Sequence, residues 1–483
     1  MIESDKASRR WRAIWRTHFY AGLVSAPFLV LMSLTGLVIL YSQPIRNATQ
    51  GELRTVSASG SWVPFETQKA AVTAAFPDTK ITTMITPAGA TSATVFGLDG
   101  GRQAFVNPYS GALLGSSKTG NDLVGLANRF HNALNNEAIK VPLPAMSALF
   151  GDGAAIQSFV LGDMLLEILA GWGLVLAASG VYLWWPRRTR ETGERVGKAI
   201  VVPRLAKRGR ARWRDLHAIP GFVLSLGLVF VLVSGLPWSA YWGKSFTAAA
   251  NKISPNVWVD APNSGVAKLG DLDRLGNQIN WNTGNAALPN STATVNAAPV
   301  NLDTIATVAT QEGMLPGYSI AFPIDGKDDV GNATYGSFTL SNSWPRKTHE
   351  SKTAYLDQFS GRTISTMSVN GYGSVSRASD TLVSTHMGTQ FGVITRVIMT
   401  LVCLLTLWSV ISASVMFLKR RRPGAVGLPR RPRELKMANR LIAITMVLGI
   451  IYPLWGVSAL LVLAFDRFVV RRTPKLRIAL GQR

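Results

Sequence analysis

The chain is poor in the residues that build covalently bonded or metal-held scaffolds. It contains a single cysteine, Cys403, which lies inside a long apolar run. One cysteine excludes an intramolecular disulfide framework and an iron–sulfur cluster held by cysteines. It also excludes a Cys-x-x-Cys-His motif, so haem cannot be attached covalently as in c-type cytochromes. Histidine is scarce as well, with five residues in a chain of 483.

Common cofactor-binding motifs are also missing. There is no Gly-x-Gly-x-x-Gly before a helical pattern, no Walker loop and no His-Glu-x-x-His. These absences exclude an attached soluble module for a flavin, a nicotinamide or ATP.

Acidic residues are few, with 27 Asp and Glu against 50 Lys and Arg, and the formal net charge is +23. Such a charge often indicates nucleic-acid binding. Here, however, the cations gather in short tracts beside long apolar runs, at Arg9–Arg16, Arg187–Arg214 and Lys419–Lys436. This is the positive-inside pattern of a bacterial inner-membrane protein, which accounts for the charge without nucleic acid.

Four apolar runs are long enough to cross the membrane, which takes about 20 residues. They lie at 18–41, 158–185, 217–242 and 386–418. The sequence therefore predicts an α-helical polytopic membrane protein with four core spans and a cytoplasmic N-terminus. The predicted N-terminal segment and first span together make up residues 1–41.

A fifth apolar run, at 438–465, is interrupted by Pro453 and Gly456. As one kinked span, it would place the basic tail 466–483 outside, against the positive-inside rule. As a re-entrant hairpin, it would keep the tail inside, with arms too short to cross. We favour one kinked span at this stage, with the hairpin as the alternative.

The connections differ in charge, which predicts their side of the membrane. The basic connections 186–216 and 419–437 are predicted to be cytoplasmic, and the long stretches 42–157 and 243–385 periplasmic. Each long stretch has the pattern of a small α+β module. In the first, 65–76 predicts a helix and 80–86, 92–98 and 102–106 predict strands. In the second, after an irregular stretch at 276–296, 302–312 predicts a helix and 317–323, 333–340 and 353–357 predict strands.

The same order of helix, outer α+β module, histidine, helix and basic tract occurs twice along the chain, which indicates an internal duplication. Phe105–Gly111 matches Tyr355–Gly361 at the ends of the two modules. A Trp-Arg pair precedes His18 at the start of span one, and another precedes His217 at the start of span three. Each half is therefore predicted to be one parallel repeat.

Four of the five histidines occupy equivalent places in this plan. His18 and His217 begin spans at the inner face, and His131 and His386 precede spans at the outer face. Two imidazoles facing each other make a six-coordinate haem centre suited to electron transfer. A pseudo-twofold axis along the membrane normal would pair His18 with His217 and His131 with His386. These four residues are therefore the predicted iron ligands of two haems.

Nearby residues suit the same site. Gly22 and Gly221, each four residues after a histidine, would leave room on the helix face for a flat macrocycle. Arg16 and Arg214 could pair with haem propionates. His349 lies outside the plan and is interpreted as an exposed loop residue, with substrate contact as the alternative. Asp163 and Glu167, on one face of span two, are open to a headgroup-layer position or to a proton or metal-contact role.

At this point the chain resembles the PepSY-associated transmembrane family, the iron-regulated membrane proteins that include ferric-siderophore reductases. The motifs that carry the resemblance are the Trp-Arg starts before His18 and His217, Gly180–Pro186, the two Tyr/Phe-Ser-Gly module ends and Pro453–Gly456. The resemblance implies two PepSY-like periplasmic modules, b-type haem in the helix bundle and electron transfer across the membrane. By position, His18, His131, His217 and His386 fall where the family's haem ligands would be.

The resulting hypothesis is an oxidoreductase with two haem b groups per chain. A quinol or a cytoplasmic reductase would donate electrons, and a periplasmic ferric-siderophore would accept them. Reduction to ferrous iron weakens binding by hard oxygen ligands, and such outer-sphere transfer needs no catalytic acid or base. Two alternatives stay open: a haem-free, membrane-anchored PepSY sensor or protease inhibitor, and a transporter. Charged residues are sparse near the middle of the spans, which disfavours the transporter.

Overall fold

The structure, a computed structural model, divides the chain into two compact units. It describes residues 2–145, 155–185, 202–203, 205–206, 208–253, 288–292, 298–327, 331–342, 345–420, 446 and 448–480. The helix unit comprises Met1–Leu37, Asn128–Ala249 and Val397–Arg483, and the sheet unit comprises Val38–Ala127 and Ala250–Arg396. Most of the predicted basic connections 186–216 and 419–437, and most of the irregular stretch 276–296, lie outside the described residues.

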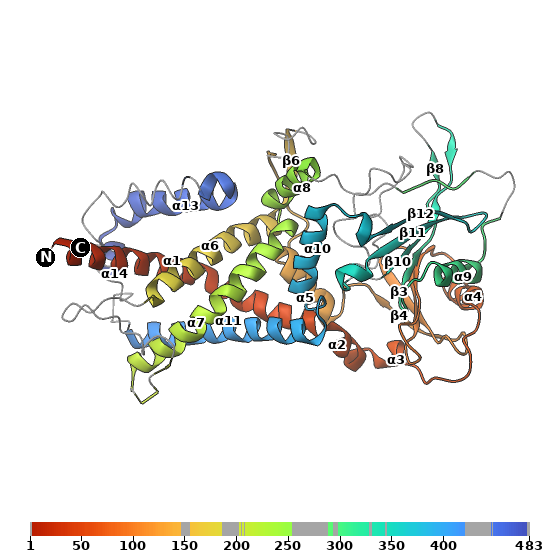
Figure 1. Cartoon of the computed structure of the whole chain (residues 1–483), viewed down its shortest axis with the longest axis horizontal. Helices are drawn as coiled ribbons and strands as arrows, with labels where there is room; N and C mark the ends of the chain where they lie inside the picture. Colours follow the sequence, from red (N-terminus) through yellow and green to blue (C-terminus); the bar gives the residue numbers. More distant parts are fainter. Residues whose placement is uncertain are drawn as a thin grey trace. The chain divides into compact units, whose positions relative to one another are not determined.

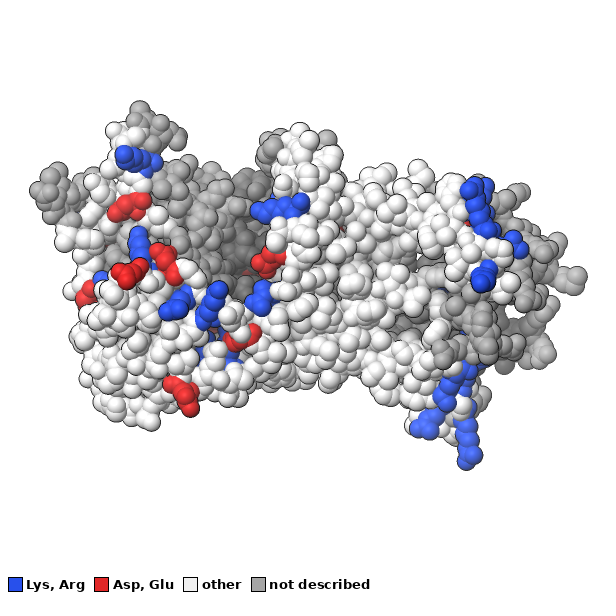
Figure 2. All heavy atoms as spheres, turned by 180° about the vertical axis from the view of Figure 1, so that it is seen from behind, with Lys and Arg blue, Asp and Glu red and all other residues white. Residues whose placement is uncertain are grey.

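Five of the described helices are long and apolar enough to cross a membrane. At most 28% of the apolar window in each is buried, so most of its side chains face outward, as lipid contact requires. In Figure 2, a broad band of the helices shows neither acidic nor basic side chains. The chain is therefore a multi-pass membrane protein. These segments are formed by α1 (Ile2–Leu40), α6 (Leu161–Trp184), α7 (Arg210–Gly235) with the 3-10 turn Leu236–Trp238, α11 (Val393–Arg420), and α13 (Pro453–Phe465) with the π-helical turn Asp466–Val470.

Glycines let these helices pack closely. A Cβ at Gly173 of α6 would lie 2.9 Å from the side chain of Leu232 of α7, and a Cβ at Gly227 of α7 would lie 2.6 Å from Val402 of α11. Only a residue without a side chain permits such a close approach, which is the usual way in which helices associate in lipid. The remaining described elements of the helix unit are short: α5 (Leu123–Ala133), whose first five residues belong to the sheet unit, α8 (Tyr241–Ile253), α14 (Pro474–Ala479) and the hairpin of β5 (Lys140–Pro144) and β6 (Ile156–Val160).

The sheet unit contains one antiparallel sheet of eight strands, in the order β12-β11-β10-β7-β1-β2-β3-β4. The two predicted modules contribute four strands each, and β1 pairs with β7 where they meet. The sequence predicted two modules but not that they share a sheet. The strands are β1 (Ile81–Ile85), β2 (Thr94–Leu98), β3 (Arg102–Val106), β4 (Leu113–Lys118), β7 (Ser319–Ala321), β10 (Ser337–Ser341), β11 (Lys352–Asp357) and β12 (Thr363–Ser368), and a separate pair is β8 (Gly326–Lys327) with β9 (Ala333–Thr334).

Two of these strands follow turns that the sequence analysis placed at the module ends. Asn107–Gly111 connects β3 to β4, and Asp357–Gly361 connects β11 to β12. Gly111 and Gly361 have φ values of 71° and 69°, a conformation that glycine adopts without strain. The turns are therefore hairpin loops, and β4 and β12 extend the sheet beyond them.

Helices α4 (Phe65–Ala75) and α9 (Leu302–Gln311), one from each module, cap each other. The carboxylate of Asp303 accepts hydrogen bonds from the Phe65 and Glu66 N–H groups at 2.7 and 3.2 Å, and the carboxylate of Glu66 accepts one from Leu302 N–H at 3.1 Å. Each helix thus has its first N–H groups satisfied by the other. Val72 and Ile305 pack with Phe96, Ile320 and Leu340 in one buried core.

The chain bends near Pro453, so that a glycine on either side of this residue lies close to the other. The α-carbons of Gly449 and Gly456 are close, because a Cβ at Gly456 would lie 2.6 Å from Gly449 Cα. After α13, the chain continues through α14 to Leu480, whose carbonyl accepts a hydrogen bond from Arg16 of α1. The tail therefore lies beside the first turns of α1, where Figure 1 marks both termini.

The remaining described helices of the sheet unit flank its strands in the chain: α2 (Ser42–Thr49), α3 (Gly51–Arg54), α10 (Ser374–His386) and the 3-10 turns Thr348–Glu350 and Val369–Gly371.

Candidate functional site

His18 of α1 and His217 of α7 face each other within the helix unit. Their ring centres are 6.4 Å apart, and their ring planes make an angle of 71°. The two residues are far apart in the sequence, and they follow the arginine of a Trp-Arg pair by two and three residues, respectively. The fold thus brings together the two histidines that the sequence analysis paired.

The imidazole of His18 is held by α6. Its Nδ1 lies 3.1 Å from the carbonyl of Leu176 and 3.0 Å from Oγ of Ser179. Because a carbonyl oxygen can only accept, Nδ1 carries the proton and donates. Nε2 is then the nitrogen with the lone pair, which is the form that binds a metal ion.

The imidazole of His217 is held by α11 in the same way. Its Nδ1 lies 3.1 Å from the carbonyl of Ser409 and 3.1 Å from Oγ of Ser412. In both cases the carbonyl comes from one residue and the hydroxyl from the residue three positions later. Hydrogen bonding of this kind fixes the tautomer and the ring orientation of metal-binding histidines.

The pair fits the axial ligation of one haem iron. A metal–nitrogen distance of about 2.0–2.1 Å places two imidazole centres on opposite sides of one metal roughly 6.3 Å apart. The observed 6.4 Å agrees with this value. Space beside the pair is also available, because a Cβ at Gly221 would meet nothing within 4 Å.

His131, near the end of α5, is held in a similar manner by α1. Its Nδ1 lies 2.9 Å from Oγ1 of Thr35, and the carbonyl of Met32, three positions earlier, is a second hydrogen-bonding partner. The Thr35 hydroxyl donates to the carbonyl of Leu31, so its oxygen accepts from His131. Burial lowers the pKa of His131 to about 4, so the ring is neutral at physiological pH.

His386 is the last residue of α10 and is half-buried. It belongs to the sheet unit, whereas His131 belongs to the helix unit. Each histidine is described within its own unit, and their pairing remains a prediction.

The family model described as the PepSY-associated TM region matches residues 15–420, which is most of the chain and includes all four predicted ligands. The chain belongs to this family. The resemblance seen in the sequence is thereby confirmed. No curated protein matches this PepSY-associated transmembrane chain.

The two arginines that we expected near haem propionates have other partners in this PepSY-associated chain. Arg16 is buried and donates to the carbonyl of Leu480 at 3.0 Å and to the hydroxyl of Tyr20 at 3.1 Å. Arg214 binds the carboxylate of Asp215, with its Nη2 2.9 Å from Oδ1. These contacts attach the tail to α1 and stabilise the start of α7, and a propionate role for either arginine stays a prediction.

The sequence analysis missed the hydroxyl residues that hold the histidines. Thr35, Ser179 and Ser412 each also donate to a carbonyl four residues earlier in their own helix. Ser234 of α7 makes the same intrahelical bond. One signal was available, since isolated Ser and Thr in apolar spans commonly hydrogen-bond across helices.

The structure also places His349 and Glu167, the other residues singled out in the sequence. His349 lies in the short turn Thr348–Glu350 and is exposed, as predicted. Glu167 is buried in α6 and accepts hydrogen bonds from the first N–H groups of α8. Among the described residues, no group of three or more His, Cys, Asp and Glu side chains is arranged to hold a metal ion.

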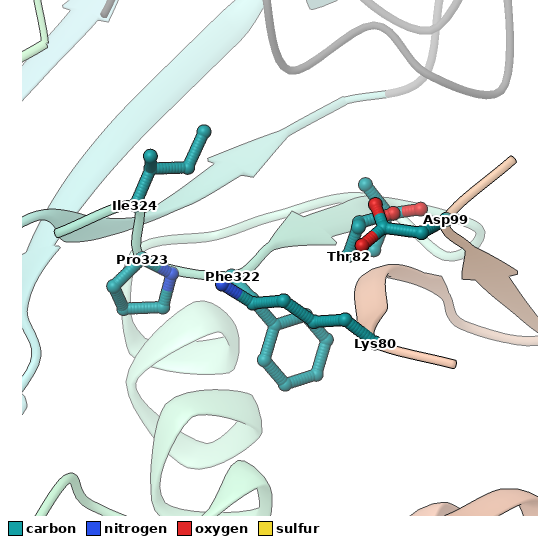
Figure 3. A pocket seen from close by; sticks show the side chains of 7 residues that line it. Lys80, Thr82, Asp99, Phe322, Pro323 and Ile324 are labelled. Atoms are coloured by element: carbon teal, nitrogen blue, oxygen red, sulfur yellow. The ribbon is translucent and has the colours of Figure 1, made fainter. Parts of the chain in front are cut away.

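The sheet unit has a cavity of about 110 Å³ beside β1. In Figure 3, Lys80 extends along the Phe322 ring, and Thr82 and Asp99 lie on the other side. Ligand pockets usually measure about 300–1,000 Å³. This cavity is therefore too small to enclose a ligand as large as a siderophore.

Proposed function

We propose that this chain is a dihaem b-type transmembrane electron-transfer protein that reduces a periplasmic ferric-siderophore and so releases iron. The observation that carries the proposal is the opposition of His18 and His217, with ring centres 6.4 Å apart and each Nδ1 bound to a neighbouring helix. A haem-free sensor or a transporter has no need for two neutral imidazoles locked in this arrangement.

The protein's part in such a reaction is to bind and orient. The carbonyls of Leu176 and Ser409 keep both Nδ1 atoms protonated, which directs both lone pairs to Nε2. Bound haem supplies reversible one-electron chemistry. With His18 and His217 both holding the iron, the bound haem would supply outer-sphere electron transfer, which would need no general acid or base.

The second centre in this proposal is formed by His131 and His386, at the other end of the spans. His131 supports it, because its ring is neutral and hydrogen-bonded through Nδ1 like the first two. The internal duplication belongs to the proposal as well. It is supported by the symmetric strand order on either side of the β1–β7 pair and by the mutual capping of α4 and α9.

In this proposal, the positive-inside rule determines which side of the membrane each part of the protein faces. With the N-terminus in the cytoplasm of a bacterium, His18 and His217 lie at the inner face, and a quinol or a cytoplasmic reductase donates there. The sheet unit then lies in the periplasm on the side of the acceptor. Ferric iron suits this acceptor role, because hard oxygen ligands hold ferrous iron less tightly.

A reduced-minus-oxidised visible spectrum of the purified protein, with a pyridine haemochrome assay, tests the proposal. We expect two b-type haems per chain, and one in His217→Ala and in His386→Ala. His349→Ala is the matched control, because this histidine is exposed and outside both pairs. A colourless protein after expression with ample haem would overturn the proposal. A full haem content in His217→Ala would overturn the first site.

A further inference from the structure

Glu167 is a buried carboxyl group whose two oxygens have different surroundings. It lies six residues after the start of α6, within a candidate membrane span, and its side chain is 1% exposed. One oxygen, Oε2, accepts from the N–H groups of Tyr241 and Trp242 at 2.8 and 3.0 Å. These bonds and the positive end of α8 favour the ionised form, whereas burial in an apolar region disfavours it.

The hydroxyl of Ser239 also lies at hydrogen-bonding range of this carboxyl group. The other oxygen, Oε1, has no hydrogen-bonding partner among the described residues, and the same holds, among other buried polar atoms, for the hydroxyl of Tyr452 and Nε1 of Trp455. All three residues are more than nine-tenths buried. An unsatisfied buried polar atom is unfavourable, so three in one place indicate a role beyond packing.

These atoms belong to one region of the helix unit. Trp455 packs on α6 at Gly171, one turn after Glu167, where an added Cβ would lie 2.6 Å from its ring. Tyr452 and Trp455 share a buried cluster with Trp242, whose N–H binds Glu167. Tyr452 also lies within electrostatic reach of Glu167.

The helix that carries Glu167 contacts the helix that carries a predicted haem ligand. A Cβ at Gly162, in the first turn of α6, would fall 1.7 Å from the carbonyl oxygen of Ala133. The first turn of α6 therefore packs against the end of α5, two residues after His131. Glu167 follows Gly162 by five residues, about 7.5 Å along the helix axis.

We propose that Glu167 is a redox-linked proton site. Glu167 takes up one proton on Oε1 when one electron reaches the centre at His131, and releases it when that electron passes to the acceptor. One positive charge thus offsets one negative charge in a region of low dielectric. Tyr452 suits both states by its chemistry, since a hydroxyl can donate to a carboxylate and accept from a carboxylic acid.

The titratable groups around this site are few. Tyr241 and Tyr452 are the described groups that interact with the charge of Glu167. Asp163, one turn earlier on the same face of α6, is partly exposed and interacts with Glu137 and Lys244. Asp163 is therefore placed to pass protons between Glu167 and water.

The inference rests on the proposed function, and potentiometric titration of the full-length, haem-loaded protein in nanodiscs tests it. Between about pH 5.5 and 8.5, we expect the midpoint potential of the haem that is lost in His131→Ala to fall by up to about 59 mV per pH unit. Glu167→Gln keeps an oxygen to cap α8 and should flatten this slope. Reduced-minus-oxidised infrared spectra should show a protonated-carboxyl band that Glu167→Gln removes and Asp163→Asn keeps.

Tyr452→Phe gives the second test, because it leaves the carboxyl group in place. We expect it to shift the carboxyl band and reduce the slope while the haem content stays constant. An unchanged slope and an unchanged band in Glu167→Gln would overturn the inference alone. A wild-type protein without haem would overturn the proposed function and this inference together.

Discussion

Arg16 and Leu480, at opposite ends of the chain, are joined by a hydrogen bond of 3.0 Å from the guanidinium to the backbone carbonyl. Arg16 belongs to the second turn of the first candidate span and is only 7% exposed. Its other described partner is the hydroxyl of Tyr20, at 3.1 Å. The C-terminal tail is therefore fixed to the end of the helix unit at which the chain begins.

This contact predicts that the two termini lie on the same side of the membrane. In a Cys403→Ser background, cysteines introduced as Ala7→Cys and Gln482→Cys should react with an impermeant maleimide from the same side. Ser59→Cys, at an exposed position in the stretch 42–157 that the sequence predicts to be periplasmic, is the comparison variant. Labelling of the two termini from opposite sides would show that the segment around Pro453 crosses the membrane once.

Ser179 and Ser412 are expected to strengthen haem binding without being ligands. Each hydroxyl oxygen accepts from the Nδ1–H of its histidine, and the adjacent carbonyl remains when the hydroxyl is removed. Ser179→Ala and Ser412→Ala should therefore lower haem affinity by about 10–100-fold, measured as haem loss to excess apomyoglobin.

Ser414→Ala is the matched control for the Ser412 variant, because Ser414 lies on the same helix and donates only to Val410 among the described residues. Ser234→Ala asks whether a fourth hydroxyl of this kind also supports a haem. Haem loss that is equally fast in Ser414→Ala and Ser412→Ala would refute a specific role for Ser412.

Gly221 offers a test of where the first macrocycle lies. An added side chain there meets nothing within 4 Å in the protein itself. Gly221→Leu should therefore leave folding and melting temperature of the haem-free protein unchanged, yet reduce haem from two per chain to one. Two haems in this variant would place the macrocycle on another side of His217.

The mutual caps of α4 and α9 predict acid sensitivity of the sheet unit. Burial raises the pKa of Glu66, but bonds from Lys69 and from the N–H of Leu302 outweigh it, and the pKa is lowered overall. The carboxylate therefore contributes stability that is complete above its unfolded pKa of about 4.3 and is lost as the pH falls through its folded pKa.

Melting temperatures between about pH 6 and 3 measure this effect. Glu66→Gln should melt lower than wild type at pH 6, and the difference should shrink as the pH falls. Glu52→Gln, at an exposed position, is the control. Asp303→Ala should cost about 1 kcal/mol through the lost caps of α4. A Glu66→Gln difference that is independent of pH would contradict the electrostatic explanation.

Local features of the fold were accessible from the sequence. The helix α6 (Leu161–Trp184) lies inside the apolar run 158–185, and β3 (Arg102–Val106) coincides with the alternating run 102–106. Hydropathy and alternation are properties of neighbouring residues, so they predict such elements without knowledge of their partners. The missed strands β4 and β12 carry Ser, Gly and Thr in place of a clear alternation.

The sequence by itself determined which segments are apolar, which histidines recur in equivalent places and which family the motifs indicate. Only the tertiary structure decided that His18 faces His217, that Ser179 and Ser412 hold them, and that one sheet spans both modules. The tertiary structure also showed that Arg16 binds the C-terminal tail and that Glu167 binds the first N–H groups of α8. Hydropathy and motifs are properties of consecutive residues, so the sequence shows them directly. The partner of a buried polar group is determined instead by packing between helices that are distant in sequence.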